Sequence, residues 1–321
     1  MAPAVAGDLV IVGSCGGTIY ALDADDGEPV WSYDTRLDGA PAQFHGEALI
    51  RGAVLYIGSD SLRETFLYAI RITDGATIWK KQFAFGVPSR ILDFGESIAF
   101  VTGEGVMVSV DPGDGSIRWR HEPESLTPGR QRISATAAGH SVVYHAGDGN
   151  LYVVDASSGQ IEQQLEVGSA AAADPVVAGG QIYLATEDGR VVRVDGLCGK
   201  IVAERQLESR PYGALQSDGE RIFMLALGEE GSRLISLDTG LESIVWEQPA
   251  DEWTTFRPLL RRGTITAGMR GQFCSFSTSV GSVLSCTPID GRVRSFGVAE
   301  DTMFIGTIGG TVLAIESPPD E

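Results

Sequence analysis

The stretch GGTIYALDADDGEPVW, residues 16–31, has the pattern of two short strands joined by a tight turn. Apolar and polar residues alternate before the turn, as in a half-buried strand. Asp26-Gly27 suits a two-residue hairpin turn, because glycine tolerates the positive φ that such turns require. Asp23 lies four residues before Gly27, and Trp31 lies four residues after it. The predicted fold depends on whether this frame occurs once or repeats.

The frame repeats along the whole chain. The turn glycines of successive copies lie 40 to 48 residues apart, at positions 27, 75, 115, 159, 199, 240 and 281. Each copy contains short apolar runs separated by Gly, Asp and Pro, which is the pattern of short antiparallel strands. An eighth copy begins with VLAIESPPDE, residues 312–321, and stops at its turn. A repeat of this length is typical of a propeller blade, so we predict an all-β protein, a β-propeller of eight four-stranded blades with the last blade incomplete.

We expect one domain over residues 1–321, with blades at about 1–38, 39–84, 85–124, 125–166, 167–207, 208–248, 249–289 and 290–321. The eighth copy lacks its outer strand, while the first copy starts at once with its innermost strand, APAVAG at residues 2–7. We therefore expect that the chain is cut from a longer polypeptide or starts further upstream. A genuine three-stranded last blade is the alternative.

Trp31 and its counterparts Trp79, Trp119 and Trp246 stand on the outer strand of their copies. The gap between neighbouring blades widens toward the rim, and a tryptophan fills it with a large apolar ring whose single N–H needs an acceptor. The aspartate before the turn, such as Asp23, is expected to accept backbone N–H groups of that turn. Both residue types are therefore predicted to be structural.

ALDADDGEPVW, residues 21–31, resembles the repeat of the PQQ-type, quinoprotein-like eight-bladed β-propellers, and the resemblance covers essentially the whole chain. It implies the fold but no single function, since the family includes quinoprotein dehydrogenases, outer-membrane assembly lipoproteins, and propellers appended to kinases and adenylating synthetases. In the dehydrogenases a pair of adjacent cysteines lies beside the cofactor. No two cysteines are adjacent here, so no PQQ and no other cofactor is expected.

The formal net charge of −19 argues against nucleic acid and anionic lipid as partners, because both need a basic surface. No apolar run approaches the roughly 18–20 residues that span a bilayer, and no leader precedes the first copy. The cysteines are dispersed, at Cys15, Cys198, Cys274 and Cys286. We therefore expect a cytoplasmic protein with four unpaired thiols and no membrane partner. A Cys274–Cys286 disulfide between neighbouring strands is the alternative.

Several arginines precede or open the innermost strand of their copies, where a propeller places them at the mouth of its central funnel. Tyr212 follows one of them, and Trp253 lies close to another. Guanidinium groups bind carboxylates and phosphates through paired hydrogen bonds. One hypothesis is that the funnel binds an anionic small molecule through Arg90, Arg132, Arg210, Tyr212, Trp253, Arg257 and Arg294. The alternative is that each arginine pairs with an acidic residue of a neighbouring blade.

The sequence contains no motif of a hydrolase, nucleotide-binding or metalloprotease site, and no catalytic residue is assigned. No metal site is expected either: His140 and His145, five residues apart on one predicted strand, point to opposite faces.

Two functions remain. The favoured one is a non-catalytic interaction scaffold, appended to a larger enzyme such as an adenylating synthetase or kinase, whose partner is a protein or a fused domain. An assembly-lipoprotein role belongs to the same class but is disfavoured, because neither a leader nor a lipidated cysteine is present. The alternative is a lyase, hydrolase, cyclase or binding protein that uses the arginine-rimmed funnel, with Tyr212 or Asp93 as acid–base partner.

Overall fold

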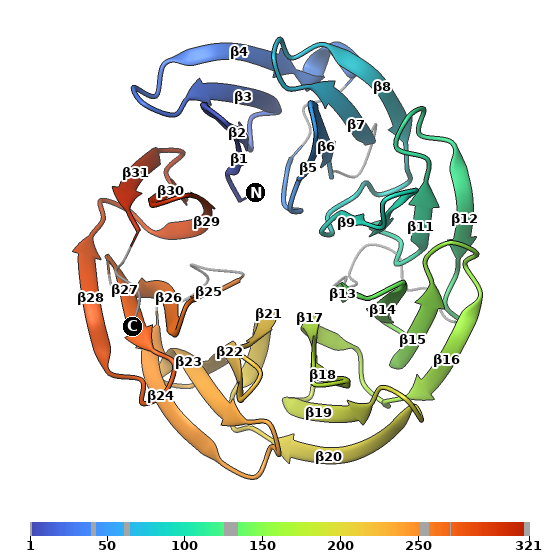
Figure 1. Cartoon of the computed structure of the whole chain (residues 1–321), viewed down its shortest axis with the longest axis vertical. Helices are drawn as coiled ribbons and strands as arrows, with labels where there is room; N and C mark the ends of the chain where they lie inside the picture. Colours follow the sequence, from blue (N-terminus) through green and yellow to red (C-terminus); the bar gives the residue numbers. More distant parts are fainter. Residues whose placement is uncertain are drawn as a thin grey trace.

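The structure is a computed structural model that describes residues 2–39, 43–60, 65–124, 134–250, 257–269 and 271–317. Its strands form eight blades around a central axis, and the chain passes from blade to blade around the ring in sequence order (Figure 1). The predicted eight-bladed propeller is confirmed. Among the described residues no helix is long and apolar enough to cross a membrane. Within the described ranges, one short 3₁₀ helix, η1 (Thr35–Asp38), interrupts the strands.

The first four blades each contain four strands. Blade 1 contains β1 (Ala4–Ala6), β2 (Leu9–Gly13), β3 (Thr18–Asp23) and β4 (Pro29–Asp34). Blade 2 contains β5 (Leu49–Arg51), β6 (Val54–Gly58), β7 (Phe66–Arg71) and β8 (Thr77–Gln82). Blade 3 contains β9 (Leu92–Asp93), β10 (Ile98–Val101), β11 (Met107–Val110) and β12 (Ile117–His121). Blade 4 contains β13 (Ser134–Ala138), β14 (Ser141–His145), β15 (Asn150–Asp155) and β16 (Ile161–Glu166).

The next three blades repeat this plan, and the last one departs from it. Blade 5 contains β17 (Ala171–Ala178), β18 (Gln181–Thr186), β19 (Arg190–Asp195) and β20 (Lys200–Gln206). Blade 6 contains β21 (Arg210–Ser217), β22 (Arg221–Gly228), β23 (Gly231–Asp238) and β24 (Ile244–Ala250). Blade 7 contains β25 (Leu259–Arg261), β26 (Thr264–Met269), β27 (Gln272–Ser277) and β28 (Val283–Pro288). Blade 8 contains, within the described residues, β29 (Val293–Ala299), β30 (Thr302–Thr307) and β31 (Val312–Glu316), as expected for an incomplete last blade.

Each blade is an antiparallel meander that runs from the axis to the rim, so its first strand is innermost (Figure 1). Blades 5 and 6 are joined further, because the innermost strands β17 and β21 pair in parallel through Ala173–Gly213 and Asp174–Ala214. The two blades therefore form one eight-stranded sheet.

The turn between β3 and β4 is longer than the predicted two-residue hairpin. The Asp23 N–H donates to the Glu28 carbonyl at 2.8 Å and the Gly27 N–H to the Asp23 carbonyl at 3.0 Å, which leaves four residues in the loop. Gly27 has a φ of 76°, as its glycine identity suggested. The longer loop lets the Asp23 carboxylate accept the Asp25 N–H at 2.8 Å, so the predicted capping role of this aspartate is confirmed.

The tryptophans join neighbouring blades, as predicted. Trp31 Nε1 donates to the Ile72 carbonyl of blade 2 at 2.7 Å, and its ring lies so close to Gly75 that a Cβ there would be 2.7 Å from it. We call this arrangement the tryptophan–glycine contact. It recurs in three more interfaces, as Trp79 with Pro112 and Gly115, Trp119 with Ala156 and Gly159, and Trp246 with Thr278 and Gly281.

Two interfaces without a tryptophan use other donors at the same place. Gln163 of blade 4 donates to the Gly196 carbonyl of blade 5 at 2.9 Å. In blade 5, Arg193 Nη1 and the Tyr183 hydroxyl donate to the Thr239 carbonyl of blade 6 at 2.9 and 3.0 Å.

Blade 7 has a serine at the tryptophan position and a disulfide beside it. Cys274 on β27 and Cys286 on β28 are directly opposite each other and are bonded, whereas Cys15 and Cys198 are free. The expectation of four unpaired thiols is therefore wrong, and its alternative is what the structure shows. The physical reason is that the turn at Gly281 brings the two cysteines to facing positions on neighbouring strands.

The core is divided among the blade–blade interfaces. Seven apolar clusters of buried residues each draw on two consecutive blades, from the interface of blades 1 and 2 to that of blades 7 and 8. Among the described residues no such cluster joins blade 8 to blade 1. These two blades meet near the axis, where a Cβ on Gly297 would overlap the carbonyl oxygen of Pro3.

Candidate functional site

Charged side chains from distant blades meet at the centre of the ring. Arg257, just before β25, places Nε 2.8 Å from Glu47 Oε1 and Nη2 3.0 Å from Asp174 Oδ2. Arg90 Nε lies 3.4 Å from the other carboxylate oxygen of Glu47. We call these four residues the central cluster. Since Glu47 precedes β5, Arg90 precedes β9 and Asp174 belongs to β17, the cluster ties together blades 2, 3, 5 and 7.

The charges of the central cluster are partly shielded from water, with 23% of the Asp174 side chain and 26% of the Arg257 side chain exposed. Burial raises the pKa of Asp174 to about 7 despite the opposing effect of Arg257, and the nearby Glu47 carboxylate raises it further. The two carboxylates outweigh the effect of burial on Arg257 and raise the pKa of its guanidinium. The cluster therefore changes its charge near neutral pH by protonating Asp174.

A cavity of about 320 Å³ opens beside the central cluster. Arg257 and Arg294 both line it, together with apolar residues such as Leu259 and Phe296. Glu47 lines it as well, so the cavity presents both signs of charge. Arg257 already donates to two carboxylates, which leaves fewer of its five N–H groups for a ligand.

The structure brings together only part of the predicted anion site. Arg90 and Arg257 share Glu47, and Arg294 lies on the same cavity as Arg257. Arg210 instead forms an ion pair with Glu187 of blade 5. Arg132 and Trp253 lie outside the described residues.

Neither predicted acid–base partner is placed for chemistry in the cavity. Tyr212 is 3% exposed and donates its hydroxyl to Ser232 Oγ at 3.1 Å within the core between blades 6 and 7. Asp93 accepts the Gly95 N–H at 2.9 Å, as a turn-capping carboxylate does, and lies 3.9 Å from Arg51.

Glu47 and Asp174 were not predicted as site residues. They lie 210 and 83 residues from Arg257 in the sequence, and neither stands in a recognisable motif. Their one available signal is that an arginine buried near the axis of an acidic propeller needs carboxylate partners. The paired arginines fit the alternative that the sequence left open, in which arginines bind acidic residues of other blades. Binding of an anionic small molecule stays a prediction.

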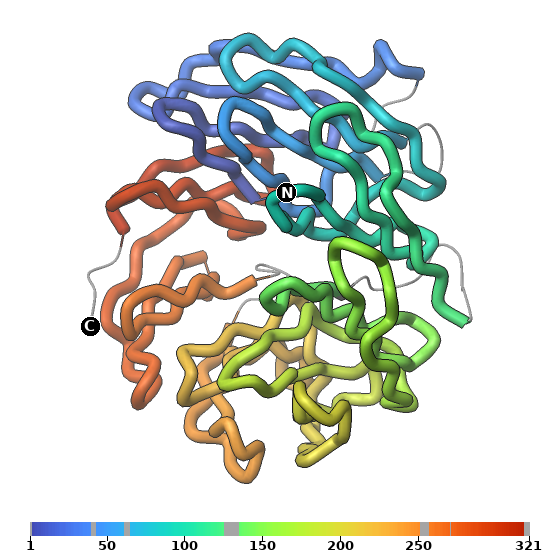
Figure 2. Tube along the Cα trace, turned by 45° about the vertical axis from the view of Figure 1, so that its right-hand side comes forward, coloured from blue at the N-terminus to red at the C-terminus, as the bar shows by residue number. Residues whose placement is uncertain are grey.

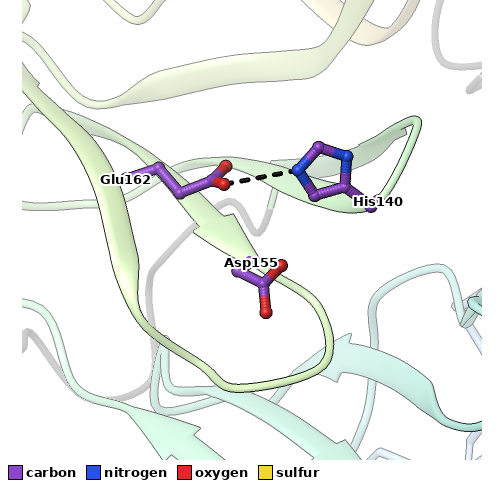
Figure 3. Close-up of side chains that lie close together, drawn as sticks. All are labelled: His140, Asp155 and Glu162. Atoms are coloured by element: carbon purple, nitrogen blue, oxygen red, sulfur yellow. Dashed lines mark ion pairs between the residues drawn. The ribbon is translucent and has the colours of Figure 1, made fainter.

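A second group of side chains has the composition of a metal site. His140, Asp155 and Glu162 offer ligand atoms within 4.8 Å of one another, and Figure 3 shows them around one end of blade 4. The two carboxylates have local roles, however. Glu162 accepts from Ser141 at 2.6 Å, and Asp155 accepts from Ser157 and Ser158, which lowers the pKa of its carboxyl to about 2. His140 is largely exposed, so we assign no metal site to this group.

His145, which shares β14 with buried neighbours, is separated from this group. It is 1% exposed and its Nε2 lies 2.9 Å from the Ser169 carbonyl. Burial lowers the pKa of His145 to about 4, so its ring is neutral in the folded protein at pH 7. His140 lies in the turn before β14 and not on the strand, so the two histidines do not share one strand as predicted.

A family model and a relative found by comparison with known proteins point to the same family. The family model PQQ_2, described as "Outer membrane protein assembly factor BamB", matches residues 1–91 and 102–317. The outer membrane protein assembly factor BamB of Yersinia pestis is 24% identical, over 97% of this chain and 83% of that protein. A serine/threonine-protein kinase, AfsK of Streptomyces griseus, is 24% identical over 54% of this chain, but the match covers only 22% of the kinase.

The fold also matches solved structures. The crystal structure of BamB from Moraxella catarrhalis superimposes with a TM-score of 0.76 and 18% identity, covering 97% of this chain and 92% of that one. At this identity the superposition supports the fold alone.

The predicted cytoplasmic location is wrong, because the family model that matches most of the chain describes an outer membrane protein assembly factor. The prediction rested on four unpaired thiols and on the lack of a leader. The Cys274–Cys286 bond removes the first argument, since disulfides persist mainly in oxidising compartments. The lack of a leader in the given sequence says nothing about location. The objection to an assembly role rested on the same absence and is withdrawn with it.

Proposed function

The chain belongs to the family of the outer membrane protein assembly factor BamB, and from this premise we propose that it is a non-catalytic scaffold that binds protein partners during assembly of the cell envelope. The observation that carries the proposal is the extent of the match, which runs through all eight blades rather than through one motif. A whole-domain likeness without a catalytic motif favours a surface-binding role over a reaction.

The central cluster supports this proposal. Its arginines contact carboxylates of other blades, so they stabilise the arrangement of the blades. An electrostatic catalyst would instead hold its donors toward the place where charge develops on a substrate.

The first experiment is a deletion of the gene in the organism that carries it, followed by quantification of the envelope proteins. We expect their assembled amounts to fall and to recover when the chain is supplied again. Fractionation should place a tagged copy in the envelope. Unchanged envelope proteins together with a cytoplasmic tagged copy would contradict the proposal.

The same strain separates the scaffold from the funnel enzyme or anion-binding protein. A double variant, Arg257→Gln with Arg294→Gln, removes both arginines that line the central cavity. If it folds, as circular dichroism can verify, a scaffold should still restore the envelope proteins. Loss of function in a folded double variant would favour the funnel.

A second candidate is a propeller domain within a longer enzyme, favoured by the partial match to the kinase. An immunoblot of the native protein from its own cells tests it. A band well above 34.0 kDa with kinase or synthetase activity in the immunoprecipitate would support this candidate. A band near that mass would reject it.

A further inference from the structure

A groove of about 950 Å³ lies between blades 5 and 6, which Figure 2 shows side by side at the lower end of the molecule, in yellow-green to orange. The end of β20 and the connector at residues 207–209 line it on the side of blade 5. On the side of blade 6 it is lined by the hairpin of β22 and β23 and by the outer strand β24. β22 and β23 have eight residues each, whereas the second and third strands of the other blades have six or fewer, so one wall of the groove is unusually long.

The equivalent place between blades 1 and 2 is filled by a segment of the chain itself. There the 3₁₀ helix η1 inserts Asp38, whose side chain is only 5% exposed. Its carboxylate accepts hydrogen bonds from the Tyr33 hydroxyl at 2.8 Å and from the Tyr68 hydroxyl at 3.1 Å. It also forms an ion pair with Lys80. A short segment with one charged side chain is therefore enough to fill this place between two blades.

The groove between blades 5 and 6 is lined by the residues equivalent to the three that hold Asp38. These are Arg205 in the place of Tyr33, Ile235 in the place of Tyr68 and Glu247 in the place of Lys80. The equivalence follows from the position in the repeat and from the register, since β23 pairs with β24 as β7 pairs with β8. Arg205 donates to the Glu242 carbonyl at 2.7 Å, so its guanidinium is directed toward the turn of blade 6.

The connector into blade 6 is too short to fill this groove as η1 fills its counterpart. Residues 207–209 alone link β20 to β21, whereas residues 35–48 link β4 to β5. Leu207 is buried in the core between blades 5 and 6. Ser209 lies against the end of β22, where a Cβ on Gly228 would be 3.4 Å from the Ser209 Cβ. The connector therefore supplies no side chain in the place of Asp38.

The charge of the groove is reversed relative to its counterpart. Glu247 stands where blade 2 has a lysine, and Glu208, Glu229 and Glu230 line the groove as well. Arg233 pairs with two of these four carboxylates, since its Nη1 lies 2.6 Å from Glu247 and its Nη2 lies 3.1 Å from Glu230. Within the described ranges, Glu208 and Glu229 form no ion pair. The side chain that complements this groove is therefore basic.

We propose that the groove binds a short segment of a partner protein, which inserts a lysine or arginine side chain beside Glu247 as η1 inserts Asp38 in the counterpart. Apolar side chains of the segment would contact Ile235 and Ile244, which also line the groove. The proposal rests on the scaffold function proposed above, because it assigns a binding site to one protein partner of that scaffold.

The position and the charge of the groove favour a partner over this chain. Both walls are formed by strands of the complete blades 5 and 6, and the first and last strands, β1 and β31, lie across the ring from them (Figure 1). A second copy is disfavoured because both molecules would carry the same net charge of −19. The same charge attracts a basic partner to the groove.

The segment that fills the counterpart supplies a probe for the groove. The peptide DTRLDG, residues 34–39, contains η1 and is closed head to tail through added glycines, because a preorganised turn loses less entropy on binding. It is compared with the same cyclic peptide carrying Asp38→Lys. Each peptide is titrated with the full chain, and binding is followed by proton NMR. We expect the Asp38→Lys peptide to bind at least about tenfold more tightly, because it meets Glu247 with the opposite charge instead of the same charge.

A charge exchange in the groove should reverse this preference. The double variant Arg233→Phe with Glu247→Lys reproduces Phe66 and Lys80 of blade 2 at the equivalent positions. If circular dichroism shows that it folds, it should bind the unchanged peptide more tightly than the Asp38→Lys peptide. Glu247→Gln is the milder variant and should remove most of the difference between the two peptides. Glu220→Lys makes the same charge change at an 81% exposed side chain between β21 and β22, and should keep the original preference.

Several outcomes would overturn the proposal. Equal affinities of the two peptides, no binding, or a preference that the Glu247 variants leave unchanged would show that the groove does not select a basic segment. A dimer in light scattering that Glu247→Gln dissociates would assign the groove to a second copy. Native protein from its own cells that carries additional residues and fails to bind the peptide, while this chain binds it, would assign the groove to the same polypeptide. None of these outcomes affects the envelope proposal, which the deletion strain tests separately.

Discussion

The turn that contains Gly75, at the interface of blades 1 and 2, differs from the equivalent turn that contains Gly27, at the interface of blades 8 and 1. At the first, the Trp31 ring covers Gly75, its N–H is bonded to the Ile72 carbonyl, and Tyr68 is fully buried. At the second, none of the described residues lies within 4 Å of a Cβ built on Gly27, and Tyr20 is 36% exposed. The sequences around the two glycines are alike, so the difference comes from the outer strand of the preceding blade. In the four interfaces that contain it, the tryptophan therefore contributes much of the contact between blades at the rim.

The strongest way to break this comparison is to remove a tryptophan from a closed interface. Trp119 is 9% exposed and donates to the Ala156 carbonyl at 2.8 Å. Trp119→Ala should lower the free energy of unfolding by about 3–5 kcal/mol, since it removes a buried ring and leaves a cavity. Urea unfolding measures the loss. Trp119→Phe keeps an apolar ring and should cost clearly less. A loss below about 1 kcal/mol for alanine would show that the ring adds little, as at an exposed site.

Removal of the disulfide tests how much it stabilises the outer strand of blade 7, which lacks a tryptophan. Cys274→Ser combined with Cys286→Ser opens a loop of 12 residues. The freed unfolded chain gains entropy, so stability should fall by about 3 kcal/mol, as for other short loops. Denaturant unfolding without reductant measures the loss, and reductant should destabilise the unmodified chain by a similar amount. Alkylation of the unfolded, unreduced chain should label only Cys15 and Cys198. Labelling of four cysteines would contradict the pairing.

Variants of the central cluster test how much the contacts at the axis contribute to stability. Arg257→Gln leaves Glu47 and Asp174 without their shared cation. Because a quarter of these side chains remains exposed, we expect a loss of about 2 kcal/mol, below the cost of breaking a fully buried pair. Arg210→Gln is the matched control, since its ion pair with Glu187 is more exposed and should contribute under about 1 kcal/mol. Equal losses in urea unfolding would show that the central position adds nothing.

The smallest effect is a pH dependence that originates at Asp174. Its pKa is about 7 in the folded protein and near 3.9 in an unfolded chain, so the folded state binds more protons between these values. Stability from this group is present below about pH 4 and is lost as the pH rises through 7. Asp174→Asn should remove that loss, so the melting temperature should change less between pH 5.5 and about 8 than in the unmodified chain. His145 works in the opposite direction, since its pKa is lowered to about 4. Parallel melting curves for the two proteins would contradict the assignment.

The fold was predictable because its determinants are local and repeated. The turn glycine recurs every 40 to 48 residues, and Trp79 and Trp119 repeat the spacing of Gly27 and Trp31. The need of the indole N–H for an acceptor follows from its chemistry. The incomplete last blade was equally visible, because the eighth copy stops at its turn.

The candidate site was predictable only in part. The arginines near the axis could be recognised from their place before an innermost strand, but their partners could not. Glu47 and Asp174 reach Arg257 only through closure of the ring, which brings blades 2 and 5 to the start of blade 7. The cysteine pair carried a usable signal, because a hairpin centred on Gly281 places Cys274 and Cys286 opposite each other.

The parallel pairing of β17 with β21 has a consequence for how the ring opens. Blades 5 and 6 share one sheet, whereas no other pair of consecutive blades in the described chain does. A fluctuation that parts these two blades must break backbone bridges at Ala173 and Asp174, while one that parts blades 8 and 1 meets no shared sheet. Local unfolding starts where the fewest contacts are lost. The amides of blades 1 and 8 should therefore exchange with solvent first, and blades 5 and 6 should persist as the last cooperative unit of the ring.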